Sequence, residues 1–356
     1  MLVLYATFNL LIMKMKIAQI APLIERVPPK TYGGTERVVH ALTEELVRRG
    51  HDVTLFASGD SETSAKLISV YPISLREAKV EKLYSANAWS LLNIGKAYEL
   101  QDQFDIIHDH NSYISLPTAN LSKTPVVMTV HGEFNPNNQK IFQELKNPYI
   151  VTISKAQAIV PEVHYGPTIY NGLPMADYPF SDKPEDYMLY VGRISRTKGA
   201  DIAIQVSLRL QKRLILAAKL DEEDRSYFQE YVEPYLSDQI QWIGEVNQQK
   251  RNELMSKALV FLHPITWREP FGLTLIEAMA CGCPVVAMNK GSIPEIIKDG
   301  ETGFVVNSME EMIDAIGKIK TINRPHCREY ALANFNSQKM AVEYEQLYKK
   351  ILNKEI

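Results

Sequence analysis

The chain has 356 residues, of which 46% are apolar and 23% are charged, and it carries 39 basic against 42 acidic side chains. This composition is typical of a globular protein and excludes a disordered or collagen-like chain. The net charge of −3 gives no overall positive field, so nucleic acid is not predicted as a partner. At roughly 150 residues per domain, the length predicts two domains.

The longest apolar stretch covers residues 1–13. It is shorter than the roughly 20 residues that a membrane-spanning helix needs, and Thr7 and Asn9 interrupt it. A secretory signal carries its positive charge before the apolar run, whereas Lys14 and Lys16 follow it here. We therefore interpret residues 1–13 as an N-terminal extension and predict no transmembrane segment.

The three cysteines are too few for a disulfide framework, which predicts a reducing, cytoplasmic compartment. Cys281 and Cys283 lie two positions apart, and Cys327 follows His326. Zinc ligands come as pairs with wider spacing, so we interpret these cysteines as small core residues and predict no metal site.

The first half of the chain alternates apolar strands with a helix. A strand is expected over residues 16–22, a helix over 35–50 and a second strand over 52–57. Such a strand–helix–strand unit predicts a parallel sheet. Further strands of this sheet are expected at 104–108, 126–130 and 149–154.

The pattern breaks into turn residues near Asn171, Gly172 and Pro174, and residues 179–184 are typical of a linker. A second series follows, with strands expected at 187–191, 213–217, 240–243, 259–263 and 284–287, helices from about Ala200 and Gly272, and an amphipathic helix at 337–352. The sequence thus predicts two α/β domains, 14–174 and 175–335, with a cleft between them and a C-terminal segment at 336–356.

Two loops are candidates for binding phosphate. Gly33 and Gly34 precede the helix expected at Thr35, whose N-terminus offers unpaired N–H groups and the positive end of a dipole. In the second domain, Arg193 and Lys198 follow a strand, where open α/β sheets bind ligands, and can neutralise a diphosphate. The alternatives are a tight turn at the glycines and a solvated basic loop at the cations.

Glu269 and Glu277 stand seven residues apart at the helix expected from Gly272. A glutamate ahead of a helix can accept hydrogen bonds from hydroxyl groups, and one farther in can accept them from a vicinal diol such as a ribose. The N–H groups at Phe271–Thr274 can hold phosphate oxygens. Alternatively, Glu269 only caps the helix and Glu277 only makes a surface ion pair.

Histidines gather at the ends of two predicted strands. His108, Asp109 and His110 end one strand, and His131 ends another. Both strand ends lie at one edge of a parallel sheet, facing the cleft, where an imidazole can meet a sugar hydroxyl or take a proton from an acceptor. The alternative for each histidine is a purely structural role.

Taken together, these features resemble the family 4 (group 1) glycosyltransferases of the GT-B fold. The resemblance covers nearly the whole chain from about Lys14, in the family's motif order, and rests on Gly33–Gly34, His131–Gly132, Asn171–Gly172, Gly192 to Gly199, Glu269-x7-Glu277, Ala280 to Val285 and Gly300-x-x-Gly303-Phe304. It implies two facing Rossmann-like domains, with a C-terminal helix that crosses back onto the first domain. It also implies transfer of a hexosyl group from a UDP- or GDP-sugar with retention of anomeric configuration.

The resemblance implies a role for each matched residue. The diphosphate would contact Arg193 and Lys198. The sugar would contact Glu269 and His131, and the ribose would contact Glu277. Main-chain groups would bind sugar and phosphate at Gly33, Gly34, Phe271, Gly272, Leu273 and Thr274, and the base at Ile243 and Gly244. His108, His110 and Asn171 are the candidates for the acceptor side.

Two features concern metal and charge. No Asp-x-Asp motif occurs, which suits an enzyme that needs no metal or cofactor and stabilises the leaving diphosphate with cations and helix ends. Many relatives have a glycine-rich turn after the strand at 213–217, whereas this chain has Ala217, Ala218, Lys219 and Leu220. We hypothesise that Lys219 supports the donor electrostatically.

The expected catalytic residues are His131, Arg193, Lys198 and Glu269. The acceptor can be a small molecule, a glycan or a lipid, the last at the inner membrane surface. Three alternatives stay open: a nucleotide-sugar epimerase, a glycoside hydrolase with paired carboxylates, and a non-catalytic nucleotide-sugar binder.

Overall fold

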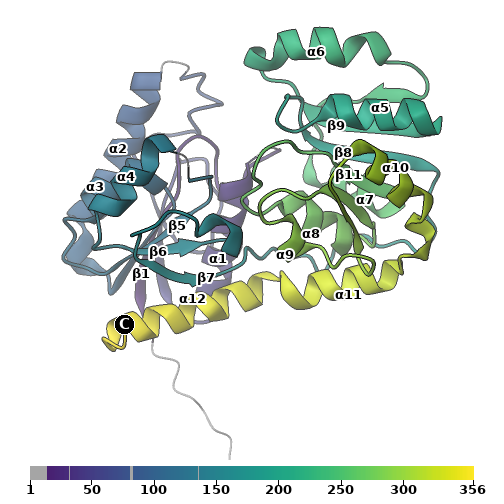
Figure 1. The fold of residues 1–356 in the computed structure, drawn as a ribbon. Helices are drawn as coiled ribbons and strands as arrows, with labels where there is room; N and C mark the ends of the chain where they lie inside the picture. Colours follow the sequence, from purple (N-terminus) through teal and green to yellow (C-terminus); the bar gives the residue numbers. More distant parts are fainter. Residues whose placement is uncertain (1–13, 32, 81–82, 135) are drawn as a thin grey trace, which may run out of the picture.

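The computed structural model describes residues 14–31, 33–80, 83–134 and 136–356. The extension expected at residues 1–13 lies outside this part of the chain. Among the helices that are described, none is both long and apolar enough to span a bilayer. The fold consists of two parallel α/β sheets that stand side by side (Figure 1).

The first sheet has seven parallel strands in the order β3-β2-β1-β4-β5-β6-β7. Its strands are β1 (Lys16–Ile20), β2 (Asp52–Phe56), β3 (Lys66–Ile68), β4 (Ile106–Asp109), β5 (Val126–Val130), β6 (Tyr149–Thr152) and β7 (Tyr165–Thr168). The accompanying helices are α1 (Gly34–Arg48), α2 (Leu83–Glu99), α3 (Leu116–Ala119) and α4 (Pro136–Glu144). The strand order reverses between β1 and β4, which is where open α/β sheets bind ligands.

The second sheet has six parallel strands in the order β10-β9-β8-β11-β12-β13. These are β8 (Tyr187–Arg193), β9 (Arg213–Lys219), β10 (Ile240–Trp242), β11 (Val260–His263), β12 (Val285–Met288) and β13 (Gly303–Val306). Its helices are α5 (Ala200–Leu210), α6 (Arg225–Tyr231), α7 (Gln248–Lys257), α8 (Leu273–Ala280), α9 (Ile293–Ile296) and α10 (Met309–Gly317). Here the strand order reverses between β8 and β11.

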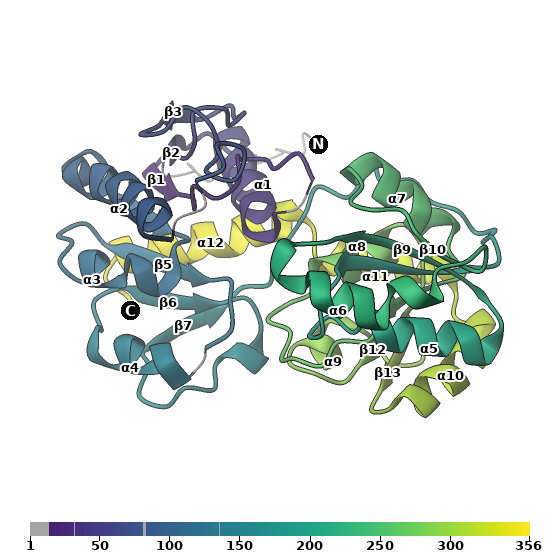
Figure 2. The ribbon, with the colours of Figure 1, turned by 90° about the horizontal axis from the view of Figure 1, so that it is seen from above.

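Two helices at the C-terminus join the sheets. In Figures 1 and 2, α11 (Arg324–Asn334) lies along the second sheet, and α12 (Ser337–Leu352) returns to the first. The chain enters α12 where Gly172 passes so close that a Cβ atom there would lie 2.2 Å from the Asn336 carbonyl oxygen. The C-terminal helix therefore crosses back as predicted, and the two facing Rossmann-like sheets confirm the expected GT-B fold.

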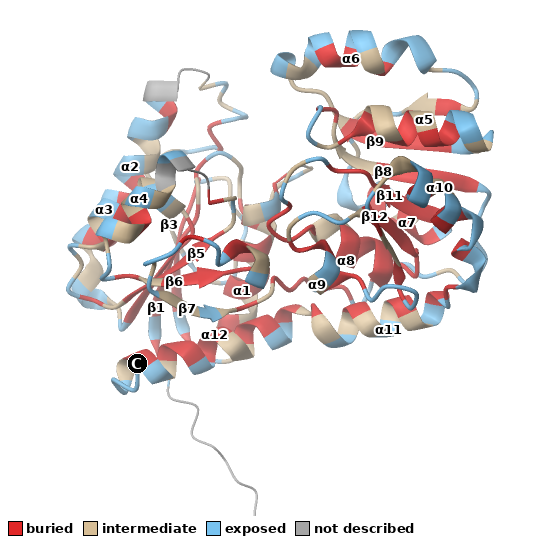
Figure 3. Cartoon of the chain, viewed as in Figure 1, coloured by how far each residue is buried: buried red, intermediate tan, exposed pale blue. Residues whose placement is uncertain are grey.

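The core explains why these segments form central strands. β5 is buried over all five of its residues, and β4 and β11 are buried over all four of theirs. Such continuous burial is typical of parallel strands that helices cover on both faces. Figure 3 shows buried residues concentrated in the strands, in α8 and on the inner side of α12.

Candidate functional site

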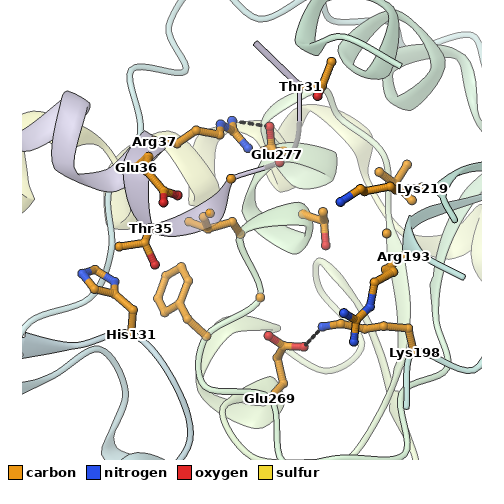
Figure 4. A pocket seen from close by; sticks show the side chains of 18 of the residues that line it. Thr31, Thr35, Glu36, Arg37, His131, Arg193, Lys198, Lys219, Glu269 and Glu277 are labelled. Carbon is orange, nitrogen blue, oxygen red and sulfur yellow. Dashed lines mark hydrogen bonds and ion pairs between the residues drawn. The ribbon is translucent and has the colours of Figure 1, made fainter. Parts of the chain in front are cut away.

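A pocket of about 770 Å³ lies between the two sheets. Its wall combines Gly33, Gly34, His131 and Asn171 from the first half of the chain with Arg193, Lys198, Lys219, Glu269, Phe271, Gly272, Leu273, Thr274 and Glu277 from the second. Several of these residues converge in Figure 4. The fold therefore brings together side chains that the sequence analysis selected from separate loops, at the edges where both strand orders reverse.

Lys198 reaches the pocket from the loop between β8 and α5. This loop turns at Gly199, whose φ is +72° and where a Cβ atom would lie 2.0 Å from the Pro264 carbonyl oxygen, so only glycine fits. Lys198 Nζ lies 2.8 Å from Glu269 Oε2 and 4.4 Å from the centre of the Trp267 ring. The ammonium group is thus held by a carboxylate and an aromatic face.

Glu269 is buried but stays ionised. Burial raises the pKa of its carboxyl group, but the Lys198 ammonium outweighs burial and lowers the pKa to about 2. The Trp267 indole N–H also donates to Glu269 Oε2 over 3.1 Å. Glu269 therefore presents a fixed negative charge to the pocket.

Arg193 lies beside the acidic turn that follows β9. Its guanidinium group lies 3.7 Å from Asp221, 3.2 Å from Glu223 and 3.4 Å from Asp224, and Lys219 Nζ lies 2.7 Å from Asp221. The oxygens of these three carboxylates lie within 4.8 Å of one another, a spacing that could also suit a metal ion. Here Arg193 and Lys219 supply the positive charge, and both cations line the pocket.

Glu277 is fully buried on α8 and uses its two oxygens differently. Oε1 accepts hydrogen bonds from Arg37 over 2.6 Å and from Arg251 over 3.1 Å. Within the described part of the chain, Oε2 has no hydrogen-bond partner. Burial raises the pKa of this carboxyl group, but Arg251 and Arg37 outweigh it and hold the pKa below its usual value. An ionised buried oxygen in the pocket wall is a site for a hydroxyl donor.

Two helices begin at the pocket. α1 begins at Gly34 and α8 at Leu273, and a Cβ atom on Gly34 would lie 3.5 Å from Leu273 Cδ1, so these N-termini lie next to each other. The first turn of a helix has N–H groups without partners inside the helix, and its dipole attracts anions. Together with the cations above, they suit a ligand that carries several negative charges.

His131 lines the pocket from the first sheet, and His263, at the end of β11, lines it from the second. His108 and His110 do not reach the wall, because they lie in the first sheet behind His131. The prediction that these two contact the acceptor is therefore not supported by their position. Asn171 does line the pocket, and its Oδ1 has no partner among the described residues.

Ile243 and Gly244 are not in the described wall, because β10 ends at Trp242 and the chain then turns outward, leaving Ile243 41% exposed. The next residues, Glu245 and Val246, do line the pocket. The segment that the sequence analysis selected for the base thus reaches the pocket at the two residues that follow Ile243 and Gly244.

Comparison with known proteins agrees with this geometry. The family model for glycosyl transferases group 1 matches residues 178–333, and the model for Glycosyltransferase Family 4 matches residues 32–161. The chain belongs to the group 1, family 4 glycosyltransferases.

Relatives of this glycosyltransferase align over most of their length. The chain is 25% identical to the glycosyltransferase MJ1607 of Methanocaldococcus jannaschii, in an alignment that covers 89% of this chain and 92% of the relative. Among solved structures, sucrose-phosphate synthase from Thermosynechococcus elongatus has a TM-score of 0.80 at 21% identity, over 96% of this chain and 100% of that one. HepE of Anabaena, in complex with UDP and glucose, has a TM-score of 0.72 at 19% identity, over 94% and 100%.

The sequence analysis missed several residues of the glycosyltransferase pocket. Arg37 and Arg251 sit on helices whose sequences give no sign that both meet Glu277. Arg37 meets it only when the two sheets come together, and Arg251 only when α7 packs against α8. Glu36 directly follows the loop that was selected and lines the pocket, and burial raises the pKa of its carboxyl group to about 7. An acidic residue in the first turn of a helix was the available signal for Glu36.

Proposed function

We propose that this glycosyltransferase moves a hexosyl group from a nucleotide-diphosphate sugar to a hydroxyl acceptor, with retention of anomeric configuration and without a metal ion or cofactor. In this proposal, residues 175–335 form the donor-binding domain and residues 14–174 the acceptor-binding domain. The observation that carries it is the buried, unpartnered oxygen of Glu277 beside two helix N-termini and a group of cations.

The proposed donor spans these groups. Glu277 Oε2 accepts hydrogen bonds from the ribose, and the diphosphate lies against Arg193, Lys198 and the first turn of α8, with Lys219 adding positive charge. Glu269 holds hydroxyls of the sugar, and main-chain groups around residues 243–246 border the base. The close approach of Gly34 to Leu273 supports a phosphate position that both helix ends share.

Charge explains the proposed reaction. The bond between the anomeric carbon and the diphosphate oxygen breaks, and the diphosphate leaves with the electron pair. The acceptor oxygen bonds to the anomeric carbon on the same face, and its proton passes to the departing phosphate oxygen. Preorganised cations and helix N–H groups stabilise the negative charge as it develops. His131 sits beside the transferred sugar as a hydrogen-bonding group.

UDP-glucose is the first donor to test, because a protein of the same fold holds UDP and glucose. The acceptor is a small molecule, a glycan or a lipid. We place the enzyme in the cytoplasm, at the inner membrane surface if its acceptor is a lipid.

The experiment is an assay of nucleoside diphosphate release from UDP-glucose, UDP-N-acetylglucosamine, GDP-mannose and ADP-glucose. Each donor is combined with small-molecule, glycan and lipid acceptor pools, with and without EDTA. We expect release from one nucleotide series that depends on an acceptor and is insensitive to EDTA. NMR of the product should show the anomeric configuration of the donor.

Other outcomes would favour the alternatives. Conversion of the donor sugar without an acceptor would indicate an epimerase, and release of sugar from an oligosaccharide without a nucleotide would indicate a hydrolase. Binding without turnover in every pool would indicate a non-catalytic nucleotide-sugar binder.

A further inference from the structure

A chain of hydrogen-bonded side chains runs from the pocket wall into the interior of the first sheet. His131 Nε2 lies 2.9 Å from His110 Nδ1, and His110 Nε2 lies 2.7 Å from Gln19 Oε1. Gln19 Nε2 then lies 3.4 Å from His108 Nδ1, which also meets the Tyr348 hydroxyl at 2.6 Å. The chain thus links a pocket residue to α12 through β1 and β4.

The direction of each hydrogen bond follows from the atoms involved. Gln19 Oε1 can only accept, so His110 Nε2 carries the proton and donates to it. A neutral imidazole has one protonated nitrogen, so His110 Nδ1 carries a lone pair and accepts. His131 Nε2 must therefore be the donor to His110. In a neutral His131, the other nitrogen, Nδ1, then carries the lone pair.

The far end of the chain fits the same direction. Gln19 Nε2 can only donate to His108 Nδ1, so this nitrogen carries the lone pair, accepts from the closer Tyr348 hydroxyl as well, and leaves the proton of His108 on Nε2. His108 Nε2 lies 2.7 Å from the Thr129 hydroxyl, which lies 2.7 Å from the Tyr344 hydroxyl on α12. Each link is satisfied by neutral imidazoles with their protons on Nε2.

We propose that Gln19 and His110 are positioning residues that hold His131 in its Nε2-protonated, neutral form, so that Nδ1 accepts a hydrogen bond from a hydroxyl of the bound sugar. This inference rests on the proposed function. It gives a positioning role to His110, which lies behind the pocket wall, and to Gln19, which the sequence analysis did not select.

Burial and packing support the neutral state of these rings. Gln19 is fully buried and His110 is 3% exposed, and the rings of His110 and His131 lie 5.2 Å apart at an angle of 31°. Burial lowers the pKa of His131 to about 4 and the pKa of His110 well below its usual value. At neutral pH, His131 is thus an acceptor of hydrogen bonds whose ring orientation is fixed from behind.

The direct test is the protonation pattern of His131 in the full-length protein. Two-bond 1H–15N correlation spectra of histidine-labelled protein distinguish a ring protonated on Nε2 from one protonated on Nδ1, and His131→Gln assigns the signals. We expect the proton of His131 on Nε2 in the unliganded protein. A proton on Nδ1 would overturn the proposal, because the Gln19 amide would then be reversed and the pocket would meet a donor.

Variants test whether the inner residues set this pattern. We expect His110→Leu to give a mixture of both protonated forms in His131, and Gln19→Leu to do the same. His110→Gln should preserve the pattern, since its amide can accept from His131 and donate to Gln19. Tyr344→Phe, at the far end of the chain, is the control and should leave His131 unchanged. An unchanged pattern in both leucine variants would overturn the positioning role.

Binding of UDP-glucose and of UDP alone separates this inference from the proposed function. We expect His110→Leu to raise the Kd for UDP-glucose about tenfold, the cost of one hydrogen bond, and to leave the Kd for UDP within twofold of the wild-type value. Equal weakening of both would overturn the proposed contact with the sugar. If the wild-type protein binds none of UDP, GDP, ADP and their sugar conjugates, the proposed function fails, and the spectra alone decide whether Gln19 and His110 position His131.

Discussion

Glu269 and Lys198 illustrate how one buried pair can serve both stability and chemistry. The carboxylate is 8% exposed, yet it stays ionised because the Lys198 ammonium lies 2.8 Å away. In a ligand that carries hydroxyls and a diphosphate, the hydroxyls can donate hydrogen bonds to the Glu269 carboxylate and the diphosphate can pair with the Lys198 ammonium. The same pair gives the folded protein a measurable dependence on pH.

We expect Glu269 to stabilise the folded protein above about pH 4.5 and to lose this contribution as the pH falls towards 2. Its folded-state pKa of about 2 lies below the ordinary value of 4.5, so the unfolded state binds the proton first and acid favours unfolding. The difference corresponds to about 3 kcal/mol at most. Urea unfolding should show that the wild type has a larger free energy of unfolding than Glu269→Gln at pH 7, and that this gap between the two proteins narrows by pH 3. A gap that does not change with pH would contradict this.

Removing a cation from the diphosphate site should slow turnover. We expect Arg193→Ala and Lys198→Ala each to lower kcat by about 10²-fold or more, because preorganised charges contribute most in the transition state. Arg196→Ala is the matched control, since Arg196 lies in the same loop, is exposed and does not line the pocket. If both pocket variants keep the turnover of the wild type, the assignment of Arg193 and Lys198 to the leaving-group site is wrong.

At the scale of elements, the sequence predicts segments whose burial is continuous or strictly periodic. The helix expected at 337–352 has the bounds of α12, and the strand expected at 126–130 has those of β5. The strands β3, β7 and β13 were missed. β3 has three residues and none is buried, and β7 contains a glycine and a proline. The pairing of β3 and β7 comes from neighbouring strands rather than from a pattern of their own, whereas the Phe304–Val306 run of β13 was an available signal.

The site divides in the same way. Loops that end a strand and begin a helix could be located from sequence, so Gly34, Lys198 and Glu269 were selected. Contacts between distant helices could not, and Arg37 on Glu277 is such a contact. His108 and His110 were assigned to the pocket because a residue at the end of a strand is expected at the edge of the sheet. How deeply its side chain is buried behind that edge depends on tertiary packing, which the sequence does not show.

The loop before α5 should tolerate no side chain at Gly199. We expect Gly199→Ala to lower the free energy of unfolding by about 1–3 kcal/mol, because φ is +72° and the new Cβ atom would meet the Pro264 carbonyl group. It should also weaken nucleotide binding by displacing Lys198. Gly95→Ala on α2 is the control, since nothing lies within 4 Å of its Cβ position. Urea unfolding of both variants checks this, and equal stability would contradict it.

At the scale of the whole molecule, the two sheets are held together on either side of the pocket. On one side, Arg37 of α1 pairs with Glu277 of α8. On the other, Glu295 of α9 accepts hydrogen bonds from the N–H groups of Lys155 and Ala156 and from the Tyr170 hydroxyl. Both contacts join the sheets beside the pocket, so they couple its shape to the relative position of the sheets.

We expect Arg37→Ala to open the pocket. The variant removes the ion pair across the pocket and leaves Glu277 with Arg251 alone, so small-angle scattering should give a larger radius of gyration than for the wild type. Arg48→Ala is the control, because Arg48 lies on the same helix and pairs locally with Glu45. An unchanged radius of gyration in Arg37→Ala would show that the Arg37–Glu277 pair does not hold the sheets together.

The most direct test of the central claim is a thermal-shift measurement with UDP, GDP and ADP on the wild type and Glu277→Gln, with and without EDTA. A ligand that binds only the folded state adds about 2.7 kcal/mol of stability at a hundredfold excess over its Kd. We predict that one nucleotide raises the Tm of the wild type, that EDTA has no effect and that the shift is lost in Glu277→Gln. If no nucleotide raises the Tm of the wild type, the pocket is not a nucleotide-sugar site.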